Sequence, residues 1–153
     1  MAKVAKVPVI MQMEAVECGA ACLAMVLAYH GKWLPLEQVR EECGVSRDGS
    51  KAKNLVLVAR SHGLKANGYR KEPEGLREVP LPAIIHWNFN HFVVLCGFKK
   101  NKVVLNDPAR GRVEVSLEEF DESFTGIVLC FEKTEEFVPP ASPGVSGNLP
   151  RSG

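Results

Sequence analysis

The chain has 153 residues, of which 46% are hydrophobic and 24% are charged, a composition typical of one soluble domain with its own core. Its 19 basic and 18 acidic residues leave a net charge of +1, so charge gives no reason to expect nucleic acid or an anionic membrane as a partner. No apolar run approaches the roughly 20 residues of a membrane span, and the N-terminus lacks the apolar stretch of a secretory signal. We therefore expect a cytoplasmic domain, monomeric in isolation.

The chain contains five cysteines, an odd number, and none of them forms a CxxC pair. Without a secretory signal, this pattern argues against a disulfide framework. A zinc site that combines Cys18 and Cys22 with histidines stays open as an alternative, although the spacing is atypical. We expect reduced thiols, most of them in the core, and neither a metal nor a cofactor.

Three helices are predicted in the first half of the chain. Residues 18–30 are apolar on nearly every side, which indicates a helix buried in the middle of the domain. Two shorter helices are expected over residues 35–44 and 50–63, the second with Ser50 as its N-cap. Each of the three helical segments runs into a glycine, the residue that most often ends a helix.

The second half changes to the pattern of β-strands. Short segments rich in β-branched residues and bounded by turn residues are expected as strands at 81–87, 91–98, 102–107, 112–116 and 126–132. A short helix that opens with a capping box, Ser116 with Glu119, is expected between the last two strands. This order indicates an α+β fold in which a helical lobe packs on a mostly antiparallel sheet.

Residues 138–153 differ from the rest of the chain in composition. This stretch contains four prolines, three glycines and three serines, and it has too few apolar residues to build a core. We expect a folded domain at residues 1–137, followed by a linker or tail at 138–153.

Cys18 is the candidate nucleophile, because it stands at the first turn of the predicted buried helix. A helix N-terminus and a neighbouring imidazolium both favour the thiolate, the reactive form of cysteine. Gly19 would let a substrate backbone approach closely. Cys22 lies one helical turn further in and is expected to be a packing residue.

A thiol nucleophile needs a base, and the chain offers four histidines. His30 and His62 each precede a helix-ending glycine, so we expect them to be C-terminal partners of the helix dipole. His86 lies inside an apolar strand and is expected to be structural. His91 begins the strand at 91–98, where its side chain can face a cleft.

Asp107 is the candidate partner of His91. If residues 99–101 form a hairpin loop, paired positions sum to about 199–201, and Asp107 lies close to the position across from His91. A carboxylate there can bind one imidazole nitrogen and leave the other for the thiol. An Asp-Pro pair is by itself more often a simple turn; the register favours the catalytic interpretation.

Gln12 is a candidate for the oxyanion hole, because a thiol is expected to attack an amide. The attack creates an oxyanion, which needs preorganised hydrogen-bond donors. The backbone N–H of Cys18 is one candidate, and the side-chain amide of Gln12, six residues upstream, is the second.

Three stretches, "QMEAVECGAACLAMVLAYHG", "NHFVVL" and "NDPARG", resemble the bacteriocin-processing peptidase family. These are papain-like cysteine protease domains at the N-terminus of peptidase-containing ABC transporters. The resemblance covers about residues 6 to 137. It implies a papain-like fold, with Cys18 as nucleophile, His91 as base, Asp107 as its orienting partner and Gln12 in the oxyanion hole.

The same resemblance implies a substrate and partners. Members of this family cut leader peptides after a Gly-Gly, Gly-Ala or Gly-Ser pair and release a mature bacteriocin or lanthipeptide. The implied partners are a precursor with an amphipathic helical leader and, in a full-length protein, the transmembrane and ATPase domains of a transporter. Such a domain would lie on the cytoplasmic side. No transmembrane or nucleotide-binding region follows in this sequence, so export itself is not expected of this chain.

The match to papain itself is only local. His91 follows Cys18 by 73 residues, against roughly 130–150 in papain, and an aspartate replaces papain's asparagine.

One alternative function is a peptidase-like module that docks substrate without cleaving it, but such modules lack the cysteine. Another is a different papain-like reaction, such as deconjugation or transglutamination, which no residue pattern favours.

Specificity for small residues predicts a narrow tunnel over Cys18. We expect some of the bulky residues near His91 to close it, namely Trp87, Phe89 and Phe92. We expect the leader to lay an apolar helix face in a hydrophobic groove. Leu64 and Tyr69 are the candidates for that groove, with ordinary core packing as the alternative for both.

Overall fold

The computed structural model describes residues 3–44, 51–88 and 91–135. A short strand precedes a block of three helices, and strands with one further helix make up the rest of the described chain. In chain order the elements are β1 (Lys3–Val4), η1 (Ala15–Glu17), α1 (Cys18–Tyr29), α2 (Leu36–Cys43), α3 (Ala52–Ser61), β2 (Leu64–Arg70), η2 (Pro73–Glu78), β3 (Ala83–Trp87), β4 (His91–Phe98), β5 (Lys102–Asp107), β6 (Gly111–Ser116), α4 (Leu117–Ser123) and β7 (Phe124–Lys133).

The strands form one sheet in the order β2-β7-β3-β4-β5-β6, and β1 pairs with β4. Every pairing between them is antiparallel. The predicted meander holds from β3 to β6, but β7 does not pair with β6. Instead α4 carries the chain back, and β7 lies between β2 and β3.

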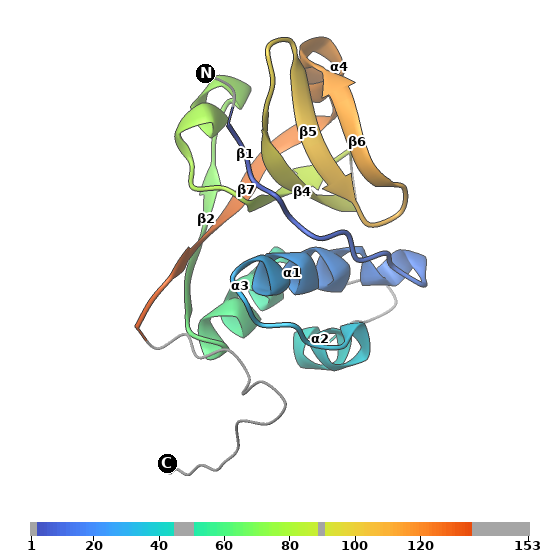
Figure 1. Cartoon of the computed structure of the whole chain (residues 1–153), viewed down its shortest axis with the longest axis vertical. Helices are drawn as coiled ribbons and strands as arrows, with labels where there is room; N and C mark the ends of the chain where they lie inside the picture. Colours follow the sequence, from blue (N-terminus) through green and yellow to red (C-terminus); the bar gives the residue numbers. More distant parts are fainter. Residues whose placement is uncertain (1–2, 45–50, 89–90, 136–153) are drawn as a thin grey trace.

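The sheet separates two layers of the molecule (Figure 1). The first core cluster packs α1, α2 and α3 against one face of the sheet. The second cluster lies on the other face, around Phe120 of α4. The predicted α+β fold, a helical lobe on an antiparallel sheet, is therefore confirmed.

Helix α1 is the centre of the helical lobe. All its residues from Cys18 to Ala28 are buried, as expected for a helix that is apolar on every side. The helix ends at Tyr29 with His30 as its C-cap, and Gly31 follows with φ 109°, a backbone conformation that residues other than glycine rarely adopt. Burial on all sides fixes the position of its N-terminal residue, Cys18, relative to the sheet.

All five strands and all four helices that the sequence predicts are present, and no bound differs from the predicted one by more than two residues. Ser116 is the N-cap of α4, and its hydroxyl accepts a 3.0 Å hydrogen bond from the Glu119 N–H, as predicted. The N-cap of α3 is Lys51, and the predicted cap, Ser50, lies outside the described residues. The predicted tail at 138–153 also lies outside them.

The sequence did not predict β1 and β2. Strand β2 pairs with β7 along its whole length, from Leu64 opposite Lys133 to Arg70 opposite Ile127. Its sequence, LKANGYR, has no β-branched residue, so strand propensity gives no signal; pairing with β7 imposes the extended conformation.

Among the described residues, none of the helices has both the length and the apolar character that crossing a membrane requires.

Candidate active site

The β4–β5 hairpin brings His91 and Asp107 together. Paired residues sum to 201 beside the turn and to 200 beyond a shift between Leu95 and Gly97, within the predicted range. Continued to His91, that register reaches residue 109, so Asp107 contacts the histidine on a diagonal. The His91 Nε2 atom lies 2.8 Å from the Asp107 Oδ1 atom.

Asp107 belongs both to a turn and to this pair. Its Oδ1 atom also accepts a 2.8 Å hydrogen bond from the Ala109 N–H, and its Oδ2 atom accepts a 3.0 Å bond from Arg110 Nε. Burial alone would raise the pKa of this carboxyl, but the bonds from His91, Ala109 and Arg110 outweigh it and lower the pKa from 3.8 to about 2. Asp107 is therefore an anion throughout the physiological range of pH.

The environment of His91 favours its protonated form. The hydrogen bond to Asp107 is the largest influence on its pKa and a hydrogen bond to Cys18 is the second; both outweigh burial and raise the pKa from 6.5 to about 9. Because Asp107 occupies the Nε2 atom, Nδ1 is the nitrogen left for the Cys18 thiol. His91 is therefore paired with Asp107, and Cys18 is near enough to influence the pKa of His91.

Cys18 is the first residue of α1 and is 6% exposed. Cys22, one turn on, is completely buried, and burial, followed by the nearby charges of Cys18 and Asp107, raises its pKa well above the ordinary value. Burial also raises the pKa of Cys43 to about 12 and of Cys96 to about 11. All five cysteines are free of disulfides, and Cys22 is a packing residue, as the sequence indicated.

Gln12 lies next to the turn that follows Asp107. Its backbone N–H donates a 2.9 Å hydrogen bond to the carbonyl of Pro108, the residue after Asp107. Its side-chain oxygen is buried and has no hydrogen-bond partner in the described structure. A buried acceptor without a partner is costly, and this cost marks the Gln12 side chain as a polar group that the core packing alone does not explain.

The other three histidines contact neither Cys18 nor Asp107 in any hydrogen bond of the described residues. His86 Nδ1 lies 2.9 Å from Thr125 Oγ1, and His62 Nε2 lies 2.7 Å from Glu42 Oε1. Burial lowers the pKa of His30, which favours the neutral imidazole, so the expectation that His30 serves the helix dipole as a cation is wrong.

Two of the three aromatic residues predicted to close the tunnel, Trp87 and Phe92, are buried. Trp87 is 3% exposed and belongs to the second core cluster, where its ring centroid lies 5.7 Å from that of Phe120. Phe92 is buried in the first cluster. Both side chains are core, because alternate positions on β3 and β4 face the two layers. Phe89 lies outside the described residues.

One of the two predicted groove residues is exposed, and the other is core. Leu64 is buried in the first cluster, so its alternative, core packing, is correct. Tyr69 is 47% exposed, and Leu57 is exposed to the same extent. Both line a surface groove of about 450 Å³ between α3 and the β2–β7 pair, together with Val56, Gly68, Ile127 and Leu129.

Two buried polar residues, to which the sequence alone gave no structural role, position the site. Asn106 is completely buried, and its Nδ2 atom donates 3.0 Å to the carbonyl of Val7, which ties the N-terminal segment to β5. Glu17 is also buried, next to Cys18. A buried carboxylate directly before the nucleophile was visible in the sequence, but its partner on α2 was not.

In the part of the chain that the structure describes, no three His, Cys, Asp or Glu side chains are grouped so that they would hold a metal ion.

Comparisons with known proteins place these residues in a family context. Residues 6–136 match the model of the Peptidase C39 family. The probable microcin-H47 secretion/processing ATP-binding protein MchF of Escherichia coli is 40% identical over 133 residues, which is 87% of this chain and 19% of that protein. The chain therefore spans about a fifth of the length of this relative.

Two solved structures are also similar. A double glycine motif protease from an AMS/PCAT transporter, in complex with a leader peptide, is 66% identical, with a TM-score of 0.85 over 86% of this chain and 95% of that one. The peptidase domain of Streptococcus ComA is 22% identical with a TM-score of 0.78, over 85% of this chain and 99% of that one. The second likeness supports the fold alone.

The pKa of His91 tests the geometry of the His91–Asp107 pair. Asp107→Asn removes the main cause of the raised pKa, so we expect it to fall from about 9 toward 6.5, as followed by NMR of the imidazole protons. Asp121→Asn, on an exposed position of α4, is the matched control and should leave the pKa of His91 in place. An unchanged pKa in Asp107→Asn would contradict the pairing.

The same pair sets a pH dependence of stability. The raised pKa of His91 adds stability that is complete below pH 6.5 and disappears as the pH rises through about 9. The lowered pKa of Asp107 adds stability that is complete above pH 3.8 and disappears as the pH falls through about 2. The loss of stability in Asp107→Asn should therefore be largest between pH 3.8 and 6.5.

Proposed function

Because this chain belongs to the Peptidase C39 family and is a cysteine peptidase, we propose that it is an endopeptidase that removes leader peptides from bacteriocin or lanthipeptide precursors. In this proposal Cys18 is the nucleophile, His91 the acid and base, and Asp107 the residue that orients His91. The observation that carries it is the 2.8 Å contact between His91 and Asp107, and Cys18 is near enough to raise the pKa of His91.

The first chemical step is attack by the Cys18 sulfur on the carbonyl carbon of the scissile amide. With a pKa of about 9, His91 carries a proton at neutral pH, and an imidazolium beside the thiol favours the thiolate. The C=O bond becomes a C–O⁻ single bond. Asp107 holds the imidazolium in place through Nε2 and stabilises its charge.

The intermediate then collapses to an acyl-enzyme. The C–N bond breaks, and His91 gives its proton to the leaving amine, which departs as the new N-terminus of the mature peptide. Neutral His91 next takes a proton from a water molecule, which attacks the thioester. Collapse of the second intermediate releases the leader as a carboxylic acid and restores the thiolate–imidazolium pair.

The oxyanion is assigned to two donors in this mechanism. One is the backbone N–H of Cys18, at the N-terminus of a helix whose dipole favours negative charge. The other is the side-chain amide of Gln12. The Pro108 carbonyl holds the Gln12 backbone beside Asp107, and this placement supports a role for the Gln12 NH₂ group in binding the oxyanion.

The proposed cleavage follows a Gly-Gly, Gly-Ala or Gly-Ser pair. A nucleophile that is only 6% exposed must be reached by a thin extended chain, and residues without large side chains satisfy that condition. Trp87 and Phe92 are core residues, so they do not support this specificity; its support is the low exposure of Cys18. Phe89 stays a candidate for a residue that narrows the tunnel.

The groove beside Tyr69 is the proposed site for the leader. Its floor and sides are apolar, with Leu57, Tyr69 and Ile127 among the lining residues, which suits the apolar face of a helix. The solved relative that is 66% identical was crystallised with a leader peptide. Lys53, Arg60 and Arg70 also line the groove, so acidic residues in the leader would add electrostatic complementarity.

The wider setting is proposed from the relatives. The chain corresponds to about a fifth of a secretion/processing ATP-binding protein, so we propose that it acts with the transmembrane and ATPase domains of a transporter, on the cytoplasmic side. Residues 1–137 would form the peptidase domain and residues 138–153 a linker. The alternative, a module that docks precursors without cleavage, is disfavoured by the presence of Cys18 at the start of α1, near enough to His91 to influence its pKa.

Cleavage of synthetic precursors tests the proposal. We expect the protein to cut a precursor directly after Gly-Gly, as located by mass spectrometry, and to leave a precursor with Gly-Val at that place intact. Cys18→Ala should bind the precursor and cut nothing, whereas Cys22→Ala should retain most activity. A precursor that is bound but not cut by the wild-type protein would support the docking module instead.

The groove is tested by charge substitutions on both sides. Tyr69→Asp and Leu57→Asp should each raise KM about tenfold or more, since a charge is unfavourable in an apolar contact, and kcat should change little. Trp33→Asp, at an exposed aromatic residue outside the groove, is the control and should leave both constants unchanged. An unchanged KM of the groove variants would refute this docking site. So would an unchanged KM of the wild-type protein for precursors in which Asp replaces the apolar residues of the leader.

A further inference from the structure

Glu17 is a buried acidic residue directly before Cys18. It is 4% exposed, and it ends the short 3-10 turn η1 that leads into α1. A buried carboxylate is unfavourable unless its oxygens accept hydrogen bonds or face a cation. The core does not require an acid at this position, so its partners indicate its purpose.

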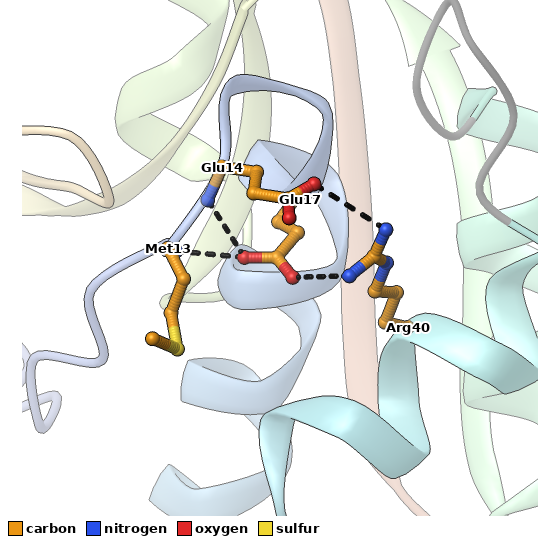
Figure 2. Close-up of polar contacts among 4 residues, drawn as sticks. All are labelled: Met13, Glu14, Glu17 and Arg40. Atoms are coloured by element: carbon orange, nitrogen blue, oxygen red, sulfur yellow. Dashed lines mark hydrogen bonds and ion pairs between the residues drawn. The ribbon is translucent and has the colours of Figure 1, made fainter.

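Both oxygens of Glu17 are occupied (Figure 2). The Oε1 atom accepts hydrogen bonds from the backbone N–H groups of Met13 at 2.7 Å and Glu14 at 2.9 Å. The Oε2 atom accepts a 2.9 Å bond from Arg40 Nη1, on α2. Arg40 Nη2 also lies 3.4 Å from Glu14 Oε1, but the Glu14 side chain is largely exposed.

These bonds fix Gln12 from both sides. On one side its own N–H is bound to the Pro108 carbonyl at 2.9 Å. On the other side the N–H of the next residue, Met13, is bound to Glu17. Glu17 is adjacent in the chain to Cys18, so a single side chain sets the distance between the Gln12 segment and the start of α1.

The two groups connected in this way are the two proposed oxyanion donors. We propose that Glu17, neutralised by Arg40, is a positioning residue that holds the Gln12 amide and the Cys18 backbone N–H in register to receive the oxyanion. This inference rests on the proposed function. It gives α2, which contributes no catalytic group, a part in the reaction.

The charge of Glu17 matters as well as its shape. A glutamine in its place can accept from the two backbone N–H groups, but its NH₂ group would face the guanidinium of Arg40, donor against donor. The turn would then open on the α2 side. Since misplacement of a reacting group by about 1 Å can lower a rate by 10², a small shift of Gln12 is enough to reduce catalysis.

The test compares Glu17→Gln and Arg40→Gln with the wild-type protein in three assays. We expect kcat for precursor cleavage to fall about tenfold, less than the 10²–10³ for complete loss of an oxyanion donor, with KM nearly unchanged. The inhibition constant of a Gly-Ala peptide aldehyde should rise by the same factor, because the thiohemiacetal oxygen occupies the oxyanion position. Alkylation of Cys18 by iodoacetamide forms no oxyanion and should change less than threefold.

A double-mutant cycle separates positioning from general weakening of the fold. If Glu17 acts through Gln12, Glu17→Gln should cost much less activity in a Gln12→Ala background than in the wild type. Glu14→Gln is the matched control, since it removes the negative charge of the other, exposed partner of Arg40 and keeps both backbone bonds to Glu17; its kcat should stay within twofold. Arg40→Lys should recover part of the activity lost in Arg40→Gln.

The outcomes distinguish this inference from the proposed function. Aldehyde affinity within twofold of wild type in both Glu17→Gln and Arg40→Gln would overturn the positioning role, as would equal loss of alkylation and turnover. Additive effects of Glu17→Gln and Gln12→Ala would overturn it too. Absence of cleavage by the wild-type protein would contradict the proposed function, and the positioning role is then decided by the aldehyde affinities. If Glu17→Gln fails to fold, Arg40→Gln, on a partly exposed side chain, gives the answer.

Discussion

The hydrogen bond between Asp107 and His91 is the interaction on which the site depends. Asp107 ends β5, and its two oxygens bind His91, Ala109 and Arg110, so one carboxylate shapes the β5–β6 turn and orients the imidazole. The cost of burying this anion is offset by three donors, and its lowered pKa shows that the donors prevail. In the proposed mechanism the Nδ1 atom of His91 is the nitrogen left for Cys18. In this account the sheet supplies the charge pair, and the helical lobe supplies the thiol.

Two further polar contacts bring the helical lobe to that pair. The Pro108 carbonyl binds the backbone of Gln12, and buried Asn106 binds the carbonyl of Val7, so the N-terminal segment is held along the end of β5. Glu17 then closes the turn that leads from Gln12 into α1 (Figure 2). Burial of α1 on all sides prevents the thiol from moving independently of the sheet. Residues that lie far apart in the sequence are thus placed by rigid elements, as precise catalytic geometry requires.

The sequence was informative where a local pattern determines the outcome. The apolar run of α1, the glycine that follows it and the hairpin register are local, and they located Cys18, His91 and Asp107. It was uninformative where tertiary pairing decides. Strand β2 has no β-branched residue and exists because β7 pairs with it; Arg40 meets Glu17 only because α2 packs beside α1. Trp87 was assigned to the cleft from its closeness to His91 in the chain, but strand alternation turns it to the opposite core.

The central claim is that Cys18, and no other thiol, becomes covalently attached to the substrate. Its most direct test is a rapid acid quench of the wild-type protein with a precursor peptide, followed by intact mass measurement and fragmentation of the labelled segment. The account predicts a thioester with the mass of the leader on Cys18, which disappears in Cys18→Ala and persists in Cys22→Ala. A thioester on Cys22, or turnover by Cys18→Ala, would contradict it.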